Sequence, residues 1–398
     1  MYNNRRPNRF NNHNRFSRFR RFGNKRTPVV PIHSFIKKAS IKAPVTVEKL
    51  PNVEVDVLKI DDRLKKNIID RGYENLMPIQ GKVIPEILVD KDVIGIANTG
   101  TGKTAAFLIP IIEKIINDSN YKALIITPTR ELALQIRDEL RKFIFQIPIY
   151  SAVCIGQSSI RNQIFELKRN PHVVIGTPGR LKDLMERRVI KTEFFNMIVL
   201  DEVDRMLDMG FLPDVKHIIS LLPKKRQSLF FSATISPEIN RLIQSFVVNP
   251  VTISVKSQET TSHIQQDVVR IEKGKTKIQT LNELLKKEGF KKVLVFGRTK
   301  MGVERLSRDL FNNGLKVVSI HGDKPQFKRQ QAIRMFKEDT ARILVATDVA
   351  ARGLDISDIS HVINYDPPAT YEDYIHRIGR TGRANKTGVA LTLVEENY

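Results

Sequence analysis

The chain has 398 residues, of which 41% are hydrophobic, which is enough for two folded domains. Its single cysteine, Cys154, excludes an intrachain disulfide and a cysteine-cluster zinc site, and we expect it to be a small packing residue rather than a nucleophile. No apolar run approaches the roughly 20 residues of a membrane helix, and no apolar segment follows the basic N-terminus as in a secretory signal. We therefore expect a cytoplasmic protein that does not enter a membrane.

Net charge is the most informative property of the composition. The 66 Lys and Arg residues outnumber the 43 Asp and Glu residues, which gives a net charge of +23. Such an excess favours a polyanionic partner, and nucleic acid is the commonest one. For the part of the chain after residue 47, a merely well-solvated surface is an equally acceptable interpretation.

The N-terminal segment at residues 1–47 differs in composition from the rest. It holds 12 Lys and Arg residues and no acidic residue before Glu48, and its first 26 residues are mainly Asn, Arg and Phe. Such a segment cannot bury enough apolar surface to order itself, so we expect a disordered basic tail. Arg can contact phosphates and Phe can stack on unpaired bases, so the tail is predicted to bind RNA. The alternative is a flexible extension without that role.

Short apolar runs alternate with amphipathic stretches from Asp92 onward, which is typical of a parallel sheet with helices on its faces. The predicted strands are Val93–Ala97, Ala123–Thr127, Val173–Thr177, Met197–Asp201, Leu229–Ser232, Val293–Phe296, Val317–His321, Ile343–Thr347, His361–Tyr365 and Ala390–Val394. The polar stretch at residues 254–262 suits a linker. We therefore predict an α/β protein with two tandem domains, at residues 48–253 and 263–398.

A glycine-rich segment, ANTGTGKT, lies between the first predicted strand and a helix. Its glycines let the backbone N–H groups face phosphate oxygens at a helix N-terminus, and its lysine supplies a charge for the β and γ phosphates. The final threonine hydroxyl can ligate Mg²⁺. A glycine-rich turn that only caps a helix is the alternative. The predicted ATP-binding residues are Ala97, Asn98, Thr99, Gly100, Thr101, Gly102, Lys103 and Thr104.

The second chemical signal is Asp201-Glu202, at the end of the predicted strand Met197–Asp201. Ligands of parallel sheets bind at this edge, so Asp201 is predicted to hold Mg²⁺ and Glu202 to orient or deprotonate the attacking water. Alone, the pair could simply begin a turn. Together with the glycine-rich segment it indicates a phosphate site that uses ATP and Mg²⁺.

Further motifs follow in a fixed order and make a family resemblance specific. They are PTRELALQ at 128–135, TPGR at 177–180, LDEVDRMLDMGF at 200–211, SAT at 232–234, VFGRT at 295–299, HGD at 321–323, ATDVAARGLD at 346–355 and HRIGRTGR at 376–383. The chain from about Val55 onward thus resembles the DEAD-box family of superfamily 2 RNA helicases, with DEVD in place of the usual tetrapeptide. The resemblance implies two RecA-like domains with ATP in the cleft between them.

The resemblance also implies roles for individual residues. Gly353 and Asp355 would contact the nucleotide, and Arg380 and Arg383 would reach across the cleft as arginine fingers. Two guanidiniums can neutralise charge on the transferred phosphoryl group only when the cleft is shut. Ser232 and Thr234 are implied to relay between nucleotide and RNA, and Asp204 and His376 are implied to bond to each other across the domain interface.

RNA would lie across both domains, with contacts mainly to phosphate and sugar and thus little sequence specificity. The implied RNA contacts are Pro128, Thr129, Arg130, Gly156, Thr177, Gly179, Arg180, Arg298, Thr299, Thr347 and Asp348. Taken one at a time, several of the predicted site residues could instead have a purely structural role. Thr177-Pro178-Gly179 could be a turn, Arg180 a solvated surface charge and His376 a packing residue.

Two segments depart from the family pattern. In the adenine-reading segment at residues 72–80, Tyr73 and Gln80 are present, but Met77 replaces a threonine and Val55 stands where an upstream aromatic is usual. Gln80 can pair with the acceptor and donor edges of adenine, so we expect adenine preference that is weaker than with the full motif. In the tetrapeptide, Val203 stands where the family has alanine, which places two extra methyl groups at a packed position.

A glycine pair of the family is also altered, because Gln157 follows Gly156. Close approach of the backbone to RNA is easiest without a side chain, so the contact near Gly156 is the less typical one.

We therefore expect a monomeric ATP-dependent RNA helicase that uses ATP binding and hydrolysis to unwind short duplexes or remodel RNA–protein complexes. One alternative is an ATP-gated RNA clamp or annealing factor with little unwinding. Another is a DNA-directed enzyme, because basic charge alone does not distinguish the two polymers. A P-loop enzyme of small molecules would leave the motifs after residue 290 unexplained.

Overall fold

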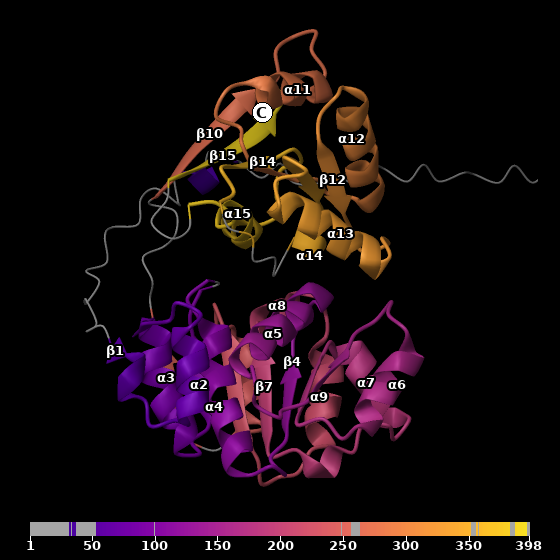
Figure 1. The fold of residues 1–398 in the computed structure, drawn as a ribbon. Helices are drawn as coiled ribbons and strands as arrows, with labels where there is room; N and C mark the ends of the chain where they lie inside the picture. Colours follow the sequence, from indigo (N-terminus) through magenta and orange to yellow (C-terminus); the bar gives the residue numbers. More distant parts are fainter. Residues whose placement is uncertain are drawn as a thin grey trace, which may run out of the picture.

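The structure is a computed structural model that describes residues 32, 34–36, 53–98, 100–247, 249–255, 263–351, 356, 358–382 and 387–395. Two α/β domains lie one above the other in Figure 1, with the N-terminal domain below. The two-domain α/β prediction is therefore confirmed. Strand β9 includes Ser254, the first residue of the predicted linker, and residues 256–262 lie outside the described chain.

The first domain is built on a seven-stranded parallel sheet with the order β5-β6-β4-β7-β8-β3-β9. Its strands are β3 (Val93–Ile96), β4 (Ala123–Ile126), β5 (Ser151–Cys154), β6 (Val173–Gly176), β7 (Met197–Asp201), β8 (Gln227–Ser232) and β9 (Val251–Ser254). Its helices are α2 (Asp62–Ile69), α3 (Pro78–Leu88), α4 (Lys103–Asn117), α5 (Arg130–Phe143), α6 (Ile160–Lys168), α7 (Pro178–Glu186), α8 (Val203–Asp208), α9 (Leu212–Ser220) and α10 (Pro237–Gln244). A small antiparallel pair, β1 (Val53–Glu54) with β2 (Asn75–Leu76), precedes the sheet, and the turns η1 (Val55–Val57) and η2 (Thr192–Phe194) complete the domain.

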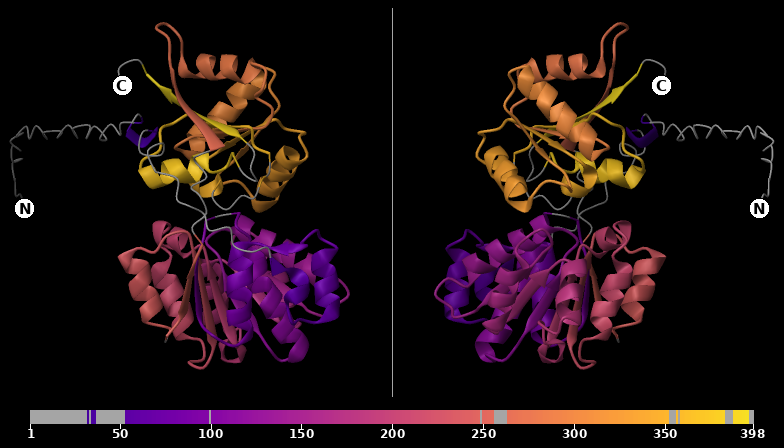
Figure 2. Two further views of the ribbon diagram at one scale, coloured as in Figure 1. Left: turned by 90° about the vertical axis from the view of Figure 1, so that its left-hand side faces the viewer. Right: turned by 90° about the vertical axis from the view of Figure 1, so that its right-hand side faces the viewer.

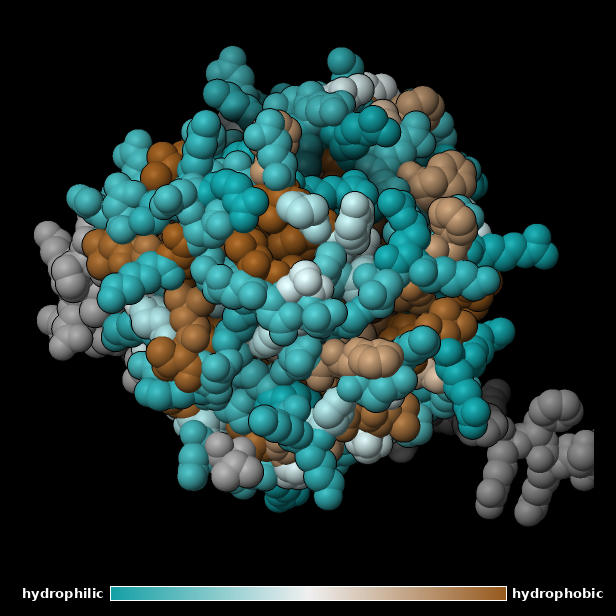
Figure 3. Space-filling model, turned by 60° about the horizontal axis from the view of Figure 1, so that its bottom comes forward, coloured by the Kyte–Doolittle hydropathy of each residue, from teal (hydrophilic) through white to brown (hydrophobic). Residues whose placement is uncertain are grey.

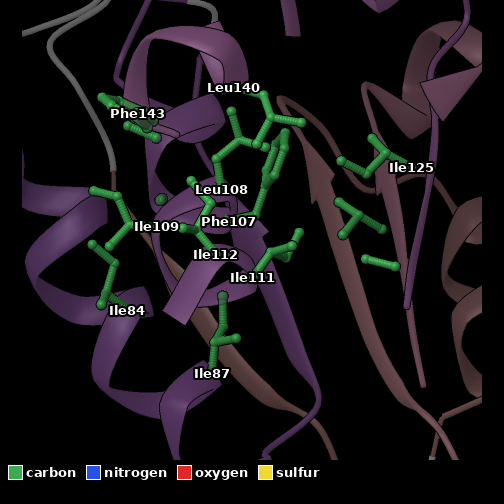
Figure 4. Close-up of a cluster of buried hydrophobic side chains, with 14 of the residues drawn as sticks. Ile84, Ile87, Phe107, Leu108, Ile109, Ile111, Ile112, Ile125, Leu140 and Phe143 are labelled. Atoms are coloured by element: carbon green, nitrogen blue, oxygen red, sulfur yellow. The ribbon is translucent and has the colours of Figure 1, made fainter. Parts of the chain in front are cut away.

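Helix α4 is the most deeply buried helix of this domain. In Figure 4, Phe107, Leu108 and Ile112 of α4 lie among side chains of α3 and α5. Because α4 is apolar on nearly all sides, it packs between its neighbours instead of facing water on one side. This packing fixes the N-terminal end of α4, where the glycine-rich segment ends.

The second domain is a six-stranded parallel sheet with the order β10-β15-β14-β11-β13-β12. Its strands are β10 (Ile264–Arg270), β11 (Val293–Phe296), β12 (Val317–Ile320), β13 (Ile343–Ala346), β14 (His361–Asn364) and β15 (Gly388–Val394). Its helices are α11 (Lys277–Lys286), α12 (Lys300–Asn312), α13 (Gln326–Lys337), α14 (Asp348–Ala351) and α15 (Tyr371–Ile378). In both domains the central strands are buried on both faces, as expected for parallel sheets.

Most of the predicted N-terminal tail lies outside the described residues. Ile32 and Ser34–Ile36 are described, however, and they are helical and lie against the second domain. Figure 2 shows this short indigo helix beside α15. These few residues therefore depart from the prediction of a tail without structure, because their apolar side chains find a partner surface.

The surface of the described residues is mainly hydrophilic on the face that Figure 3 brings forward. Apolar residues there form separate groups among polar and charged ones. Scattered apolar side chains are ordinary on a folded protein. In the described part of the chain, no helix is both long and apolar enough to span a bilayer.

Candidate ATP and RNA sites

The glycine-rich segment forms a loop between β3 and α4, as predicted. Gly100 and Gly102 have φ values of 83° and 85°, which only glycine adopts without strain. Gly102 is the residue immediately before α4, so the loop delivers backbone N–H groups to a helix N-terminus. Lys103 is buried, and its Nζ donates to the carbonyl oxygen of Ala97 at 2.8 Å.

The adenine-reading segment packs directly on this loop. Gln80 is fully buried, its Nε2 donates to the Gly102 carbonyl at 3.1 Å, and its Oε1 accepts from the Met77 N–H at 2.8 Å. A Cβ on Gly102 would lie 2.4 Å from Gln80 Nε2 and 2.7 Å from the Met77 sulfur, so both side chains would have to shift, and the positive φ itself favours glycine. The Gln80 amide thus joins the segment to the phosphate loop in this structure.

Tyr73 of that segment and Val55 upstream of it both pack within the first domain. The Tyr73 hydroxyl donates to Glu139 at 2.8 Å, and its ring contacts Phe143 edge-on with centroids 5.6 Å apart. Val55, at the position of the missing aromatic, is buried in the core. In this structure, therefore, both side chains belong to the packed interior of the first domain.

Asp201 ends β7 beside the phosphate loop. Burial raises the pKa of its carboxyl to about 7, while the nearby Lys103 charge acts in the opposite direction. Its Oδ1 is buried without a hydrogen-bond partner. An unpaired buried carboxylate oxygen close to a loop that can hold phosphates fits a Mg²⁺ ligand. Among the described residues no cluster of three acidic, His or Cys ligands is present. Mg²⁺ in nucleotide sites is commonly held by one or two carboxylates plus substrate phosphates.

Glu202 has a left-handed backbone conformation, with φ 57°. For a residue with a side chain this conformation is strained, and such strain concentrates at functional sites. Its Oε2 accepts from Nη1 of Arg205 at 2.6 Å, and both side chains are buried. Arg205 was not among the predicted site residues, although it belongs to the LDEVDRMLDMGF motif.

Asp204 bonds to the segment that follows β8 in the first domain. Its Oδ2 accepts from the Ala233 N–H at 2.9 Å and from the Thr234 N–H at 3.1 Å. The Asp204 N–H in turn donates to Ser232 Oγ at 3.3 Å. The predicted bond from Asp204 to His376 across the interface stays a prediction. The tetrapeptide and the SAT segment form one connected unit.

A cleft of about 390 Å³ lies where the two domains meet. The predicted RNA contacts that line it are Pro128, Thr129, Arg130, Gly156, Thr177, Gly179 and Arg180. The second domain contributes Gly322, Arg329 and Val349. The structure therefore gathers all the predicted first-domain contacts on one surface that also includes the second domain.

Three arginines, Arg130, Arg180 and Arg329, line this cleft together with the acidic residues Glu131 and Asp183. The pKa of Arg130 is lowered by burial first and then by the charges of Arg329 and Arg180. Guanidiniums that repel one another at a partly buried site would be stabilised by an anion. The N-terminal ends of α5 and α7 begin beside the same residues, directly after Thr129 and Thr177. Helix N-termini with adjacent arginines are a suitable surface for phosphates.

The four predicted contacts of the second domain lie outside this cleft. Thr299 is the N-cap of α12, and the Arg298 N–H donates to Asp366 at 2.8 Å. Thr347 is buried at the end of β13, and Asp348 next to it forms a bidentate ion pair with Arg377, at 2.5 and 2.7 Å.

Arg377 connects α15 to two other parts of the second domain. Besides Asp348 it bonds to Asn364, and its guanidinium lies 5.1 Å from the centroid of the Phe296 ring. It was not predicted as a site residue, although the HRIGRTGR motif contains it. The Asp348 carboxylate is thus held by the protein itself.

The remaining predicted residues divide into two groups. His376 lies in the last turn of α15, and Arg380 is buried just beyond that helix. Thr99, Gly353, Asp355 and Arg383 lie outside the described residues.

Contacts between the domains include residues that the sequence did not single out. Glu131 is buried and accepts from Arg329 Nη2 at 2.8 Å and from Gln326 Nε2 at 3.0 Å. Gln157, the departure from the glycine pair, has φ 56°, accepts from Arg130 and donates to the Gly322 carbonyl at 3.3 Å. Glu131 lies within a recognised motif, but nothing in the amphipathic sequence of α13 marks Gln326 or Arg329 as its partners.

A phosphate loop, a strand-end Asp-Glu pair and an arginine-containing cleft shared by two parallel-sheet domains define a nucleotide-driven enzyme of nucleic acids. Residues 77–242 match the DEAD/DEAH box helicase family, and residues 276–385 match the helicase conserved C-terminal domain. The chain is 47% identical over 343 residues to the DEAD-box ATP-dependent RNA helicase CshA of Bacillus licheniformis, a match that covers 84% of this chain and 69% of the relative. It is 46% identical over 350 residues to the protein of the same name from Bacillus subtilis, covering 86% and 68%. The chain belongs to the DEAD/DEAH box helicase family and spans roughly two thirds of the length of these relatives.

Solved structures agree with this assignment. The chain is similar to S. cerevisiae Dbp5 bound to RNA and ADP BeF3, with a TM-score of 0.76, 30% identity and coverage of 86% of this chain and 90% of that one. It is also similar to Mss116p bound to single-stranded RNA and AMP-PNP, with a TM-score of 0.78, 32% identity and coverage of 87% and 75%. The tandem RecA-like architecture is therefore confirmed.

Proposed function

We propose that this chain couples ATP binding and hydrolysis between its two domains to local separation of short RNA duplexes or remodelling of RNA–protein complexes. As a member of the family described above, it is an ATP-dependent RNA helicase. The observation that carries the proposal is the shared cleft, because its lining residues come from both domains. RNA bound in this cleft would hold the domains together, and ATP bound between them would do the same.

Each residue of the phosphate site has a distinct proposed task. The phosphate loop and Lys103 bind the β and γ phosphates, and Thr104 and Asp201 are the proposed ligands of Mg²⁺. The ion would neutralise charge that develops on the transferred phosphoryl group. Glu202 orients or deprotonates the attacking water, and Arg205 keeps its carboxylate in place.

Coupling between the two ligands follows from domain closure. Arg380 and Arg383 of the second domain can act on the nucleotide only when the cleft is shut. RNA that favours the shut arrangement would therefore raise the ATPase rate. Hydrolysis then removes one of the ligands that hold the domains together, so the domains separate and RNA is released.

The decisive experiment measures ATPase activity and duplex release with purified protein. Single-stranded RNA should raise ATP hydrolysis at least about tenfold over the rate without RNA. Matched DNA should stimulate far less. A Glu202→Gln variant should bind ATP yet lose hydrolysis by at least about a hundredfold, and it should fail to release short duplexes repeatedly. An RNA-independent ATPase rate, or equal stimulation by DNA, contradicts the proposal.

We also propose that the protein acts in the cytoplasm. Support comes from its single cysteine, which is buried, because proteins of oxidising compartments more often use cysteines in disulfides. Fractionation of cells that express a tagged chain tests the proposal, and recovery mainly with the membrane fraction contradicts it.

A further inference from the structure

Residues 32 and 34–36 are helical and lie against the second domain, although they precede the first domain in the chain. Ile32 is only 4% exposed. The ring of Phe35 lies edge-on to Tyr371, with centroids 5.6 Å apart, and tilted against Tyr374, with centroids 6.0 Å apart. Phe35 and Ile36 pack against a cluster formed by Ile264, Tyr374, Ile378 and Ala390. The segment therefore occupies an apolar surface made by α15, β10 and β15.

The helix that receives this segment is joined by an ion pair to α14, which contributes to the lining of the RNA cleft. Tyr371, Tyr374 and Ile378 form one stripe of α15 at helical spacing. A different side of the same helix carries Arg377, which pairs with Asp348 at the start of α14. The next residue, Val349, lines the cleft. A helix is about 10 Å across. The segment is therefore separated from Val349 of the cleft mainly by α15 and α14.

The chain immediately before the segment is the most basic part of the sequence. Residues 1–26 hold 9 Lys and Arg residues and no acidic residue. An extended chain spans at most about 3.6 Å per residue, so Arg26 lies no more than about 22 Å from Ile32. Docking of this segment therefore keeps Arg26, at the C-terminal end of the basic stretch, near α15, whatever conformation residues 27–31 adopt.

We propose that residues 32–36 are an intramolecular anchor that fixes the basic tail to α15, so that single-stranded RNA bound by the tail stays beside the second domain. This inference rests on the RNA-dependent activity proposed above. Arg and Phe of the tail supply phosphate contacts and base stacking, neither of which selects a sequence. Because a tethered tail acts at high local concentration, the anchor increases apparent RNA affinity without any new contact in the cleft. It also makes the tail move with the second domain when the domains separate.

The contact itself is tested by photo-crosslinking in the full-length chain. A photoreactive phenylalanine analogue at position 35 should form an intramolecular crosslink to a peptide that contains residues 371–378. A crosslink to the first domain alone, or the absence of an intramolecular crosslink, overturns the anchor.

The consequence is tested by substituting Phe35 with a charged residue in the otherwise unchanged chain. Phe35→Asp should raise the RNA concentration for half-maximal ATPase stimulation at least about fivefold, because the apolar contact is lost and the tail is released. The rate at saturating RNA and the rate without RNA should not change. Ser34→Asp adds the same charge at the exposed neighbouring position and should leave the half-maximal RNA concentration within about twofold.

A second comparison separates the anchor from simple support of α15. Removal of residues 1–26 should raise the half-maximal RNA concentration by a similar factor, and Phe35→Asp in that shortened chain should add little, since both changes act through the tail. If Phe35→Asp has the same effect with and without residues 1–26, the segment acts on α15 alone and the proposal is wrong. If the unchanged chain shows no RNA-stimulated ATPase, the proposed function fails. RNA affinities measured by anisotropy for the same four chains then decide the anchor.

Discussion

Val203 occupies the one position of the DEVD segment that carries no carboxylate. It is completely buried and packs in the cluster that includes Leu200 and Met206. The neighbouring carboxylates take their positions from other contacts, such as the bonds of Asp204 to Ala233 and Thr234. The valine therefore contributes packing, whereas the chemistry depends on its neighbours.

Replacing Val203 by alanine should therefore affect stability more than activity. Loss of two buried methyl groups should lower the free energy of unfolding by about 1–2 kcal/mol. The ATPase rate at saturating RNA should stay within about twofold. Urea unfolding followed by fluorescence or circular dichroism measures the first quantity, with Val57→Ala at an exposed position as the control. A more stable variant would show that the valine overfills its site.

Cys154 illustrates how burial decides the chemistry of a single side chain. It lies fully buried in β5, and burial raises the pKa of its thiol to about 12. Thiolate is the reactive form, so almost none is present near neutral pH. The expectation of a packing residue agrees with this environment.

Thiol alkylation should thus be negligible in the native protein at pH 8. Addition of denaturant should expose the thiol, return its pKa toward the ordinary value and give complete modification within the same time. Mass spectrometry of samples treated with iodoacetamide reads both states. Rapid native labelling would show that β5, at the edge of its sheet, opens readily.

The N-terminus of α3 is the element in which the adenine-reading segment departs most from its family. Met77 is the N-cap residue, its backbone is extended, and its side chain carries no oxygen that could cap the helix, whereas Gln80 Oε1 accepts from the Met77 N–H. A threonine there could accept a bond from a free N–H of the first turn. The same hydroxyl would face the phosphate loop, because the Met77 side chain lies next to Gly102.

Met77→Thr should accordingly stabilise the first domain by about 0.5–1 kcal/mol. It should also increase the preference for ATP over GTP, which we expect to be modest in the unchanged chain. Thermal unfolding and a nucleotide panel in the ATPase assay give the two readouts, with Met77→Ala as the control that removes the thioether without adding a hydroxyl. ATP preference of several orders of magnitude in the unchanged chain would show that Gln80 is sufficient.

Among the elements, all strands in the middle of the two main sheets were predictable, whereas of the four edge strands only β12 was. Each of the ten strands predicted from apolar runs is present, with ends that differ by no more than two residues. The main-sheet strands that escaped prediction, β5, β9 and β10, all lie at sheet edges. Edge strands are less fully buried, so polar residues interrupt their apolar ones, as in VTIS of β9 and IQQDVVR of β10. A search for continuous apolar runs cannot detect that pattern.

At the scale of the whole molecule, the motifs located the site but not the contacts between the domains. Each motif lies on one element and has a local signal, such as glycines in a loop or carboxylates after a strand. The pairing of Glu131 with Arg329 depends on how one folded domain meets the other, across 197 intervening residues. A single sequence carries no local pattern for such a distance, and the same holds for the bond from Gln157 to Gly322.

The ion pair between Glu131 and Arg329 leads to a prediction about domain closure. Both side chains are almost completely buried, and their elements, α5 and α13, belong to different domains. If one partner is removed, the other charge is buried without its partner only when the two domains are in contact. The substitution should therefore disfavour domain closure and not the folding of either domain. Arg329→Gln should lower the RNA-stimulated kcat/KM at least about tenfold, with thermal unfolding changed by less than about 2 °C.

A double-mutant cycle separates this pair from a general loss of positive charge in the cleft. If the two side chains act through each other, Glu131→Gln combined with Arg329→Gln should be much less impaired than the sum of the single effects, with a coupling energy of about 1–3 kcal/mol. Additive effects would mean that Arg329 acts on RNA directly, as its position in the cleft also allows. Arg334→Gln, on the same helix and outside the cleft lining, controls for net charge and should leave kcat/KM within about twofold.

Because Gln326 also bonds to Glu131, Gln326→Ala should show the same sign of coupling with Glu131→Gln, but a smaller magnitude, as expected for a donor without a charge.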